Sequence, residues 1–133
     1  MKIILIQLCL SVLCFQAINA QLKFSGTWKG FEISDSASTE SNEVYFIDFI
    51  AINGLLEGNM RIENQHKEVQ IIQIKGTKRY LDFQIDEKRI LQTTSKQNHP
   101  TLNPYYFKYN LERGYLEGYK NDSSNKKIIL FKS

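Results

Sequence analysis

Short alternations of apolar and polar residues, separated by turn residues, run through the chain from residue 21 to its end. No stretch in this region keeps the three-to-four-residue apolar spacing of an amphipathic helix. Alternation with a period of two is typical of half-buried strands, because successive side chains point to opposite faces of a sheet. Aromatic residues make up 12% of the chain, and Tyr and Phe favour strands. The pattern predicts an all-β fold.

We expect about eight to nine short strands. The segments are 22–33, 43–52, 55–63, 67–75, 78–85, 88–94, 105–112, 115–120 and 127–132. The Asn53-Gly54 pair supports the positive φ angles of a tight hairpin, so the strands on either side of it should be neighbours. Further turns are expected at Gly76-Thr77, Asp86-Glu87, Arg113-Gly114 and residues 121–125.

Strands at this spacing fit either a sandwich or a closed barrel. In segment 55–63 the apolar residues Leu56, Met60 and Ile62 share one face, and polar residues occupy the other. Segments 78–85 and 105–112 alternate in the same way. Consecutive hairpins with one apolar and one polar face favour an up-and-down antiparallel β-barrel. Such a barrel also leaves no exposed strand edges. We therefore predict a single barrel domain over residues 21–133.

The first twenty residues have the layout of a secretory signal peptide. Lys2 gives a basic start, residues 3–15 are almost entirely apolar, and Ala20 supplies a small residue for cleavage. An uncleaved anchor is the alternative, but the apolar run is short for a membrane span. Because Cys9 and Cys14 both lie in this segment, the mature protein is expected to be disulfide-free, without a membrane span, and secreted or periplasmic.

Three motifs resemble those of the calycins, the group that contains lipocalins, avidin-like proteins and fatty-acid-binding proteins. Gly26-Thr27-Trp28 resembles their first-strand signature, and residues 53–58 are similar to a hairpin of avidin-like barrels. Residues 115–119, which include Leu116-Glu117-Gly118, and residues 128–132 resemble the final hairpin of compact bacterial lipocalin-like domains.

The resemblance implies a lipocalin-like barrel in which Gly26 and Trp28 are structural residues near the closed end. Lipocalins commonly place an arginine of the last strand over this tryptophan, and Lys132 is the nearest candidate here. The chain departs from the avidin-like pattern because Trp28 is its only tryptophan, so biotin binding is not implied.

Residues for catalysis, metal binding or nucleic-acid binding are sparse. His66 and His99 lie among polar residues, and a solvated turn explains His66 better than a metal site with Glu63 and Glu68. There is no phosphate-binding glycine loop and no Gly-x-Ser-x-Gly motif. A net charge of +3 is too small to indicate nucleic-acid binding. We expect no enzyme activity, metal or cofactor, although carboxylates that meet in space remain open as acid–base groups.

The inward faces define the candidate ligand-binding residues. They are Trp28, Val44 or Tyr45, Phe46, Leu56, Met60, Ile62, Phe83, Tyr105, Phe107 and Tyr109. The orientation of segment 43–52 is open, because either of its two faces is apolar enough to point inward. Glu32 and Asp48 occupy positions where a strand normally has apolar residues. Each carboxylate therefore either points outward or is a polar contact for a ligand in the lumen.

We expect a lipocalin-like protein that binds a small apolar or amphipathic ligand in the barrel lumen. The alternative is a protein-interaction or inhibitor module with a filled core, which acts through its loops and a Tyr-rich face. The tyrosines of the late hairpin are Tyr105, Tyr106, Tyr109, Tyr115 and Tyr119.

Signal cleavage predicts a mature protein that begins at Gln21. The intact mass of the exported protein, together with N-terminal sequencing, measures this directly. A mass that retains residues 1–20 would contradict both the cleavage and the inferred compartment.

Overall fold

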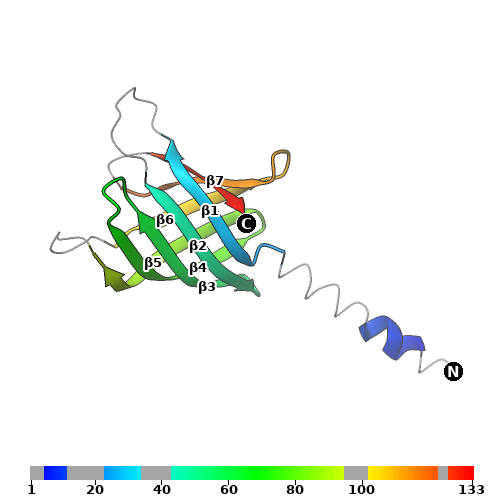
Figure 1. The fold of residues 1–133 in the computed structure, drawn as a ribbon. Helices are drawn as coiled ribbons and strands as arrows, with labels where there is room; N and C mark the ends of the chain where they lie inside the picture. Colours follow the sequence, from blue (N-terminus) through cyan, green and yellow to red (C-terminus); the bar gives the residue numbers. More distant parts are fainter. Residues whose placement is uncertain (1–4, 12–22, 34–42, 95–101, 123–125) are drawn as a thin grey trace.

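A computed structural model describes residues 5–11, 23–33, 43–94, 102–122 and 126–133. Apart from a short exposed helix at residues 5–11, these residues form eight strands that close into one antiparallel barrel (Figure 1). The strands are β1 (Gly26–Ile33), β2 (Val44–Ile52), β3 (Leu55–Glu63), β4 (Val69–Arg79), β5 (Asp82–Thr93), β6 (Pro104–Asn110), β7 (Tyr115–Lys120) and β8 (Lys127–Lys132). Each strand pairs with the next, and β1 also pairs with β8. The predicted all-β, up-and-down barrel is confirmed, and its architecture is compatible with a calycin.

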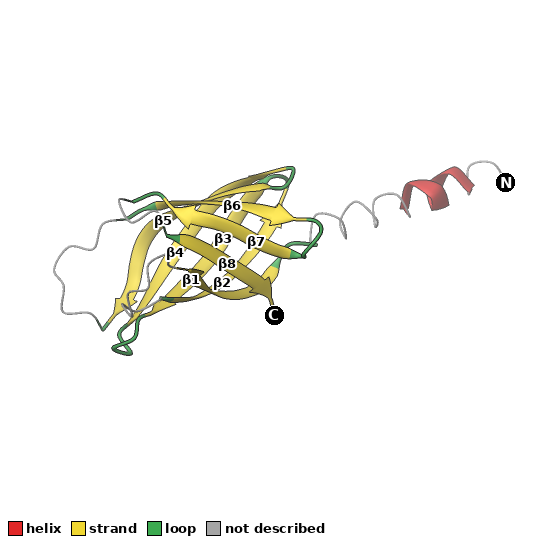
Figure 2. Cartoon of the chain, turned by 90° about the horizontal axis from the view of Figure 1, so that it is seen from above, coloured by secondary structure: helices red, strands yellow, loops and turns green. Residues whose placement is uncertain are grey.

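The two ends of the barrel differ in how the strands are connected (Figure 2). At one end, which we call the base, the connections are the short turns 53–54, 80–81 and 111–114. At the other end, which we call the mouth, the fully described connection is residues 64–68, and β1, β5 and β7 end there while β2, β6 and β8 begin there. Residues at the ends of barrel strands commonly carry function on a rigid scaffold, so the described residues at the mouth are the first candidates for a site.

Two predicted turns are wrong, and their loss reduces nine expected segments to eight strands. β4 continues through Gly76-Thr77, and β5 continues through Asp86-Glu87. The chain reverses between these strands at Tyr80, which has a φ of 58° and is 80% exposed. Gly76 allows β4 to approach β5 closely and does not form a turn, since a Cβ there would lie 1.9 Å from the carbonyl oxygen of Gln84.

The base is closed by an aromatic cluster around Trp28, which is buried as expected. Its indole N–H donates to the carbonyl of Phe24 at 2.9 Å. The Phe24 ring meets Phe83 and Tyr109 edge to face, with centroids 5.4 and 4.9 Å away. Lys132 is the strand partner of Trp28, but its ammonium donates to the Lys23 carbonyl at 2.6 Å. The Lys132 ammonium is thus held by a backbone carbonyl of the segment that leads into β1.

Inward side chains fill the middle of the barrel. The residues with no exposed surface are Tyr45, Ile47, Met60, Ile74, Ile85, Tyr105, Leu116, Ile128 and Leu130. An eight-stranded barrel has an interior that its own side chains can just fill. The middle of this lumen is such a packed core.

Small barrels bring neighbouring strands very close where they bend, and inward glycines permit this contact. At Gly58 in β3, an added Cβ would lie 1.9 Å from the carbonyl oxygen of Asp48 in β2. At Gly118 in β7, it would lie 1.8 Å from the carbonyl oxygen of Tyr106. Because the obstacle is backbone in both cases, a side chain cannot be accommodated by a rotamer change.

Substitution of Gly58 by alanine is expected to lower the free energy of unfolding by about 3 kcal/mol, the upper range for overpacking. The matched variant Asn59→Ala changes the next residue, whose side chain is exposed, and should stay within about 0.5 kcal/mol of the wild type. Denaturant unfolding of both variants measures the difference. Equal stabilities would show that the β2–β3 contact is not constrained by this glycine.

Candidate functional site

The inward faces become polar at the mouth. Glu32 of β1, Tyr45 of β2, Glu87 of β5 and Tyr105 of β6 are buried there, and Glu43, just before β2, is half-buried beside them. We call these five residues the mouth cluster. The strand alternation that places Trp28 and Ile85 inside also places Glu32 and Glu87 inside, four and two residues further along their strands.

Tyr45 joins two carboxyl groups of the mouth cluster. Its hydroxyl lies 2.7 Å from Oε1 of Glu32 and 2.9 Å from Oε2 of Glu43. A tyrosine hydroxyl has a single hydrogen, so it donates to only one of these oxygens at a time. The two carboxyl groups therefore compete for one proton.

Tyr105 holds the third carboxyl group. Its hydroxyl donates to Oε1 of Glu87 in a short hydrogen bond, and the backbone N–H of Asn103 donates to Oε2 at 3.3 Å. The rings of Tyr45 and Tyr105 meet edge to face with centroids 6.2 Å apart. This ring contact joins the two halves of the mouth cluster.

Burial controls the ionisation of the cluster. Desolvation raises the pKa of both Tyr45 and Tyr105 far above the ordinary value of a tyrosine, and their negatively charged neighbours raise it further. Both hydroxyls therefore keep their proton and act as donors. Desolvation also raises the pKa of Glu87, although the Tyr105 hydrogen bond and the Lys120 charge oppose that shift.

Two lysines bring positive charge to the mouth. The Lys126 ammonium lies 3.6 Å from Oε2 of Glu32, and the Lys120 ammonium lies 5.9 Å from the centroid of the Tyr105 ring. Oε2 of Glu32 is buried and receives no hydrogen bond from the described residues. Within the part of the chain that the structure describes, Oε2 of Glu32 thus has an ionic neighbour but no hydrogen-bond donor.

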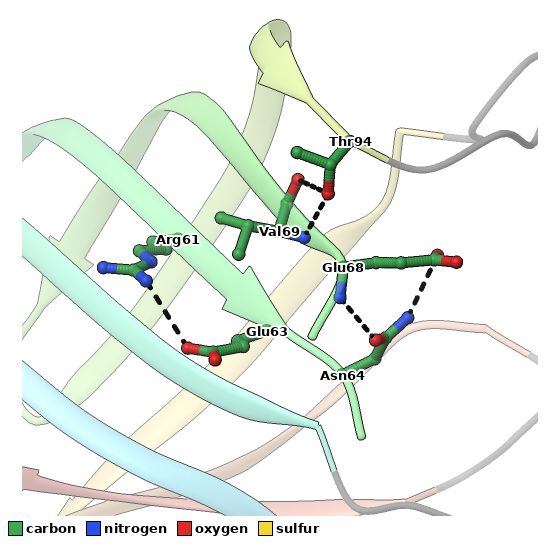
Figure 3. Close-up of polar contacts among 6 residues, drawn as sticks. All are labelled: Arg61, Glu63, Asn64, Glu68, Val69 and Thr94. Atoms are coloured by element: carbon green, nitrogen blue, oxygen red, sulfur yellow. Dashed lines mark hydrogen bonds and ion pairs between the residues drawn. The ribbon is translucent and has the colours of Figure 1, made fainter. Parts of the chain in front are cut away.

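The rim beside this cluster is ordered by the turn between β3 and β4 (Figure 3). Oδ1 of Asn64 accepts hydrogen bonds from the backbone N–H groups of His66 and Glu68, at 3.0 and 2.9 Å. The Thr94 hydroxyl accepts the Val69 N–H at 2.8 Å and so ties this turn to the end of β5. His66 is thus an exposed turn residue. Among the described residues, no three His, Cys, Asp or Glu side chains are grouped so as to hold a metal ion.

Most of the predicted lumen residues do face inward. Those whose side chains lie in or against the core are Trp28, Glu32, Tyr45, Leu56, Met60, Ile62, Phe83, Tyr105, Phe107 and Tyr109. They are divided between the two ends: Trp28, Phe83 and Tyr109 belong to the base, whereas Glu32, Tyr45 and Tyr105 meet at the mouth.

Phe46 was expected in the lumen but lies on the outer face of β2, as does Val44. Asp48, whose orientation was open between an outward position and a ligand contact, lies on the same outer face. The Phe46 ring is flanked by Lys29 and Arg61, at 5.2 and 5.4 Å. The outward position of Asp48 keeps its carboxylate in water, which avoids the desolvation of an unpaired charge.

The sequence interpretation missed Glu43 and Glu87. Glu87 was assigned to a turn, although it continues the inward alternation of Phe83 and Ile85. Glu43 precedes β2 and carries no alternation signal of its own. Its role is visible only through the contact with Tyr45.

A second concave feature lies on the outside of the barrel. This outer groove has a volume of about 800 Å³ and crosses β4 to β8, with Tyr106, Lys108, Glu117 and Tyr119 among its lining residues. The rings of Tyr106 and Tyr119 are 5.6 Å apart. Part of the predicted Tyr-rich face is therefore outward, while Tyr105 and Tyr109 point inward.

No protein-family model, curated protein or solved structure matches this chain. Among the described residues, no helix has the length and apolar character needed to cross a membrane.

The raised pKa of Glu87 predicts a specific dependence of stability on pH. The folded state holds this proton more tightly than the unfolded state, in which glutamate titrates near its ordinary value of 4.5. The free energy of unfolding should therefore fall as pH rises from 4.5 through the raised pKa, by at most about 1.4 kcal/mol per pH unit.

Glu87→Gln removes this titrating group and should therefore reduce the decrease in the free energy of unfolding with rising pH. Denaturant unfolding across this pH range measures that decrease. Glu57→Gln, an exposed substitution in β3, is the control and should leave the pH dependence of the free energy of unfolding unchanged. Parallel curves for Glu87→Gln and the wild type would contradict the assignment of the raised pKa to Glu87.

Proposed function

We propose that this protein is an exported, calycin-like binding protein without catalytic activity, and that it takes a small amphipathic ligand at the mouth of the barrel. The observation that carries the proposal is the mouth cluster itself. A few polar groups converging on an apolar site are what fix the orientation of a small ligand. The secretory signal expected in residues 1–20 would bring the protein to an extracytoplasmic compartment.

Stability alone gives no reason for these residues. Burying carboxyl groups costs more than burying apolar side chains of similar size, even when the carboxyl groups are paired. Glu32 is only 5% exposed and Glu87 only 8%, although apolar residues at both positions would extend the core. Groups with perturbed pKa values concentrate at functional sites, which favours a role in binding.

The filled lumen limits the size of the ligand. Met60, Ile74 and Ile85 are fully buried below the cluster, so a long acyl chain would have to displace packed core residues. Apolar surface next to the cluster comes from Ile62, the strand partner of Tyr45, and Ile128, the strand partner of Glu32. These contacts favour a compact ligand with a polar head and a short apolar body.

The outer groove supports a second candidate, the protein-interaction module with a filled core. Tyr119 is 47% exposed beside Tyr106, and exposed tyrosines are common in protein interfaces. The groove, however, mixes Arg79 and Lys108 with Asp82 and Glu117 and has no dominant charge to select a partner. We therefore rank it below the mouth.

Titration with hexylamine, hexanol and hexanoate, followed by chemical-shift changes in NMR spectra, tests the proposal. At least one probe should bind saturably, with the largest shifts at the mouth cluster and Ile62. Ile62→Trp should block the mouth and abolish binding. Ile50→Trp, on the outer face of β2 and 58% exposed, is the control for the added indole.

Failure of all three probes to bind the folded wild type would overturn the proposal. Shifts centred on Tyr106 and Tyr119 would favour the outer groove instead. If Ile62→Trp does not fold, the location of the shifts in the wild type still decides between the two sites.

A further inference from the structure

We infer that the ligand head is a protonated amine, and that the Lys126 ammonium competes with it for Glu32. This inference rests on the proposed function, because it assumes that the mouth binds a small ligand. It adds the chemical class of that ligand and the residue that recognises its charge.

The hydrogen-bonding groups of the mouth cluster are unequally matched. Glu32, Glu43 and Glu87 act only as acceptors when ionised. The described groups that donate to them are the Tyr45 hydroxyl, the Tyr105 hydroxyl and one backbone N–H. A ligand that supplies donors and no acceptors complements this arrangement, and an ammonium group supplies three donors.

Oε2 of Glu32 shows the same mismatch at a single atom. It is buried, it belongs to a side chain that points into the lumen, and no described residue donates a hydrogen bond to it. Lys126 lies at 3.6 Å, beyond the usual N–H···O distance of about 3.2 Å. An ammonium in direct contact with Oε2 would form the charge-assisted hydrogen bond that this oxygen lacks.

The charge of the mouth discriminates between head groups. Among the described residues, three carboxyl groups face two lysines, so a ligand carboxylate would meet repulsion and find few donors. The aromatic rings add to the preference for a cation, because the ring faces of tyrosines attract positive charge. The Lys120 ammonium already lies near the Tyr105 ring, which shows that a cation is accommodated there.

Lys126 acts as a tethered competitor in this arrangement. Its side chain is 36% exposed, and it precedes β8 directly, so its long aliphatic stem can swing toward solvent and release Glu32. Lys127 is the matched comparison, because it is the next residue and pairs with Glu117 in the outer groove. Removing Lys126 should strengthen amine binding, whereas removing Lys127 should not.

The test measures dissociation constants by titration calorimetry near neutral pH for hexylamine, hexanol and hexanoate, which share one apolar body. We expect hexylamine to bind about tenfold tighter than hexanol, with hexanoate weakest. Glu32→Gln should weaken hexylamine binding about tenfold and leave hexanol unchanged. Lys126→Met should tighten hexylamine binding several-fold, and Lys127→Met should have no effect.

Equal affinity for amine and alcohol, tighter binding of hexanoate, or an unchanged hexylamine affinity in Glu32→Gln would overturn the inference while the proposed function stands. If none of the three probes binds, both the proposed function and this inference are overturned. If Glu32→Gln does not fold, two other results still test the inference. They are the order of the affinities of the three probes, and the tighter hexylamine binding expected for Lys126→Met but not for Lys127→Met.

Discussion

Closure of the barrel through β1 is the constraint on which the rest of the structure depends. β1 pairs with β2 on one side and with β8 on the other, so all eight strands are hydrogen-bonded on both edges. A barrel of this size leaves an interior about as wide as its own side chains. The close strand contacts at Gly58 and Gly118 are the local condition for that curvature, since any Cβ there would strike a neighbouring carbonyl. A packed core between base and mouth follows from these contacts.

Because the middle is packed, the inward positions serve different purposes along the barrel axis. At the base, Trp28 and Phe24 close the core with rings and one hydrogen bond to backbone. At the mouth, the same alternation brings in Glu32 and Glu87, whose carboxyl groups need tyrosine hydroxyls to remain buried. The barrel is therefore held together mainly by its apolar middle and base. The mouth is the part in which residue choice departs from what packing alone would select.

The sequence was sufficient for the fold and for much of the inward face, because alternation is a local signal that survives in each strand. The Asn53-Gly54 hairpin was also readable, since both residues take a positive φ there. The two wrong turns have different physical origins. Gly76 was assigned to a turn because a glycine needed for a close strand approach looks the same in sequence as a glycine needed for a turn. Glu87 was assigned to a turn because two adjacent acidic residues are typical of an exposed turn, and the partner that allows its burial, Tyr105, is distant in the chain and meets it across the β5–β6 pair.

The burial that makes the mouth cluster costly is also the physical basis of the affinity for a cation that we propose for it. A desolvated carboxyl group holds its proton more tightly, as the raised pKa of Glu87 indicates, and it interacts more strongly with an opposite charge than the same group in water. An ammonium at the mouth therefore competes with protons for the same oxygens. Amine binding beside Glu87 would favour its ionised form, lower its pKa and offset part of the cost of burying it. Binding and folding are thus linked through Glu87, and the proposed affinity for an amine should decline as falling pH protonates this residue.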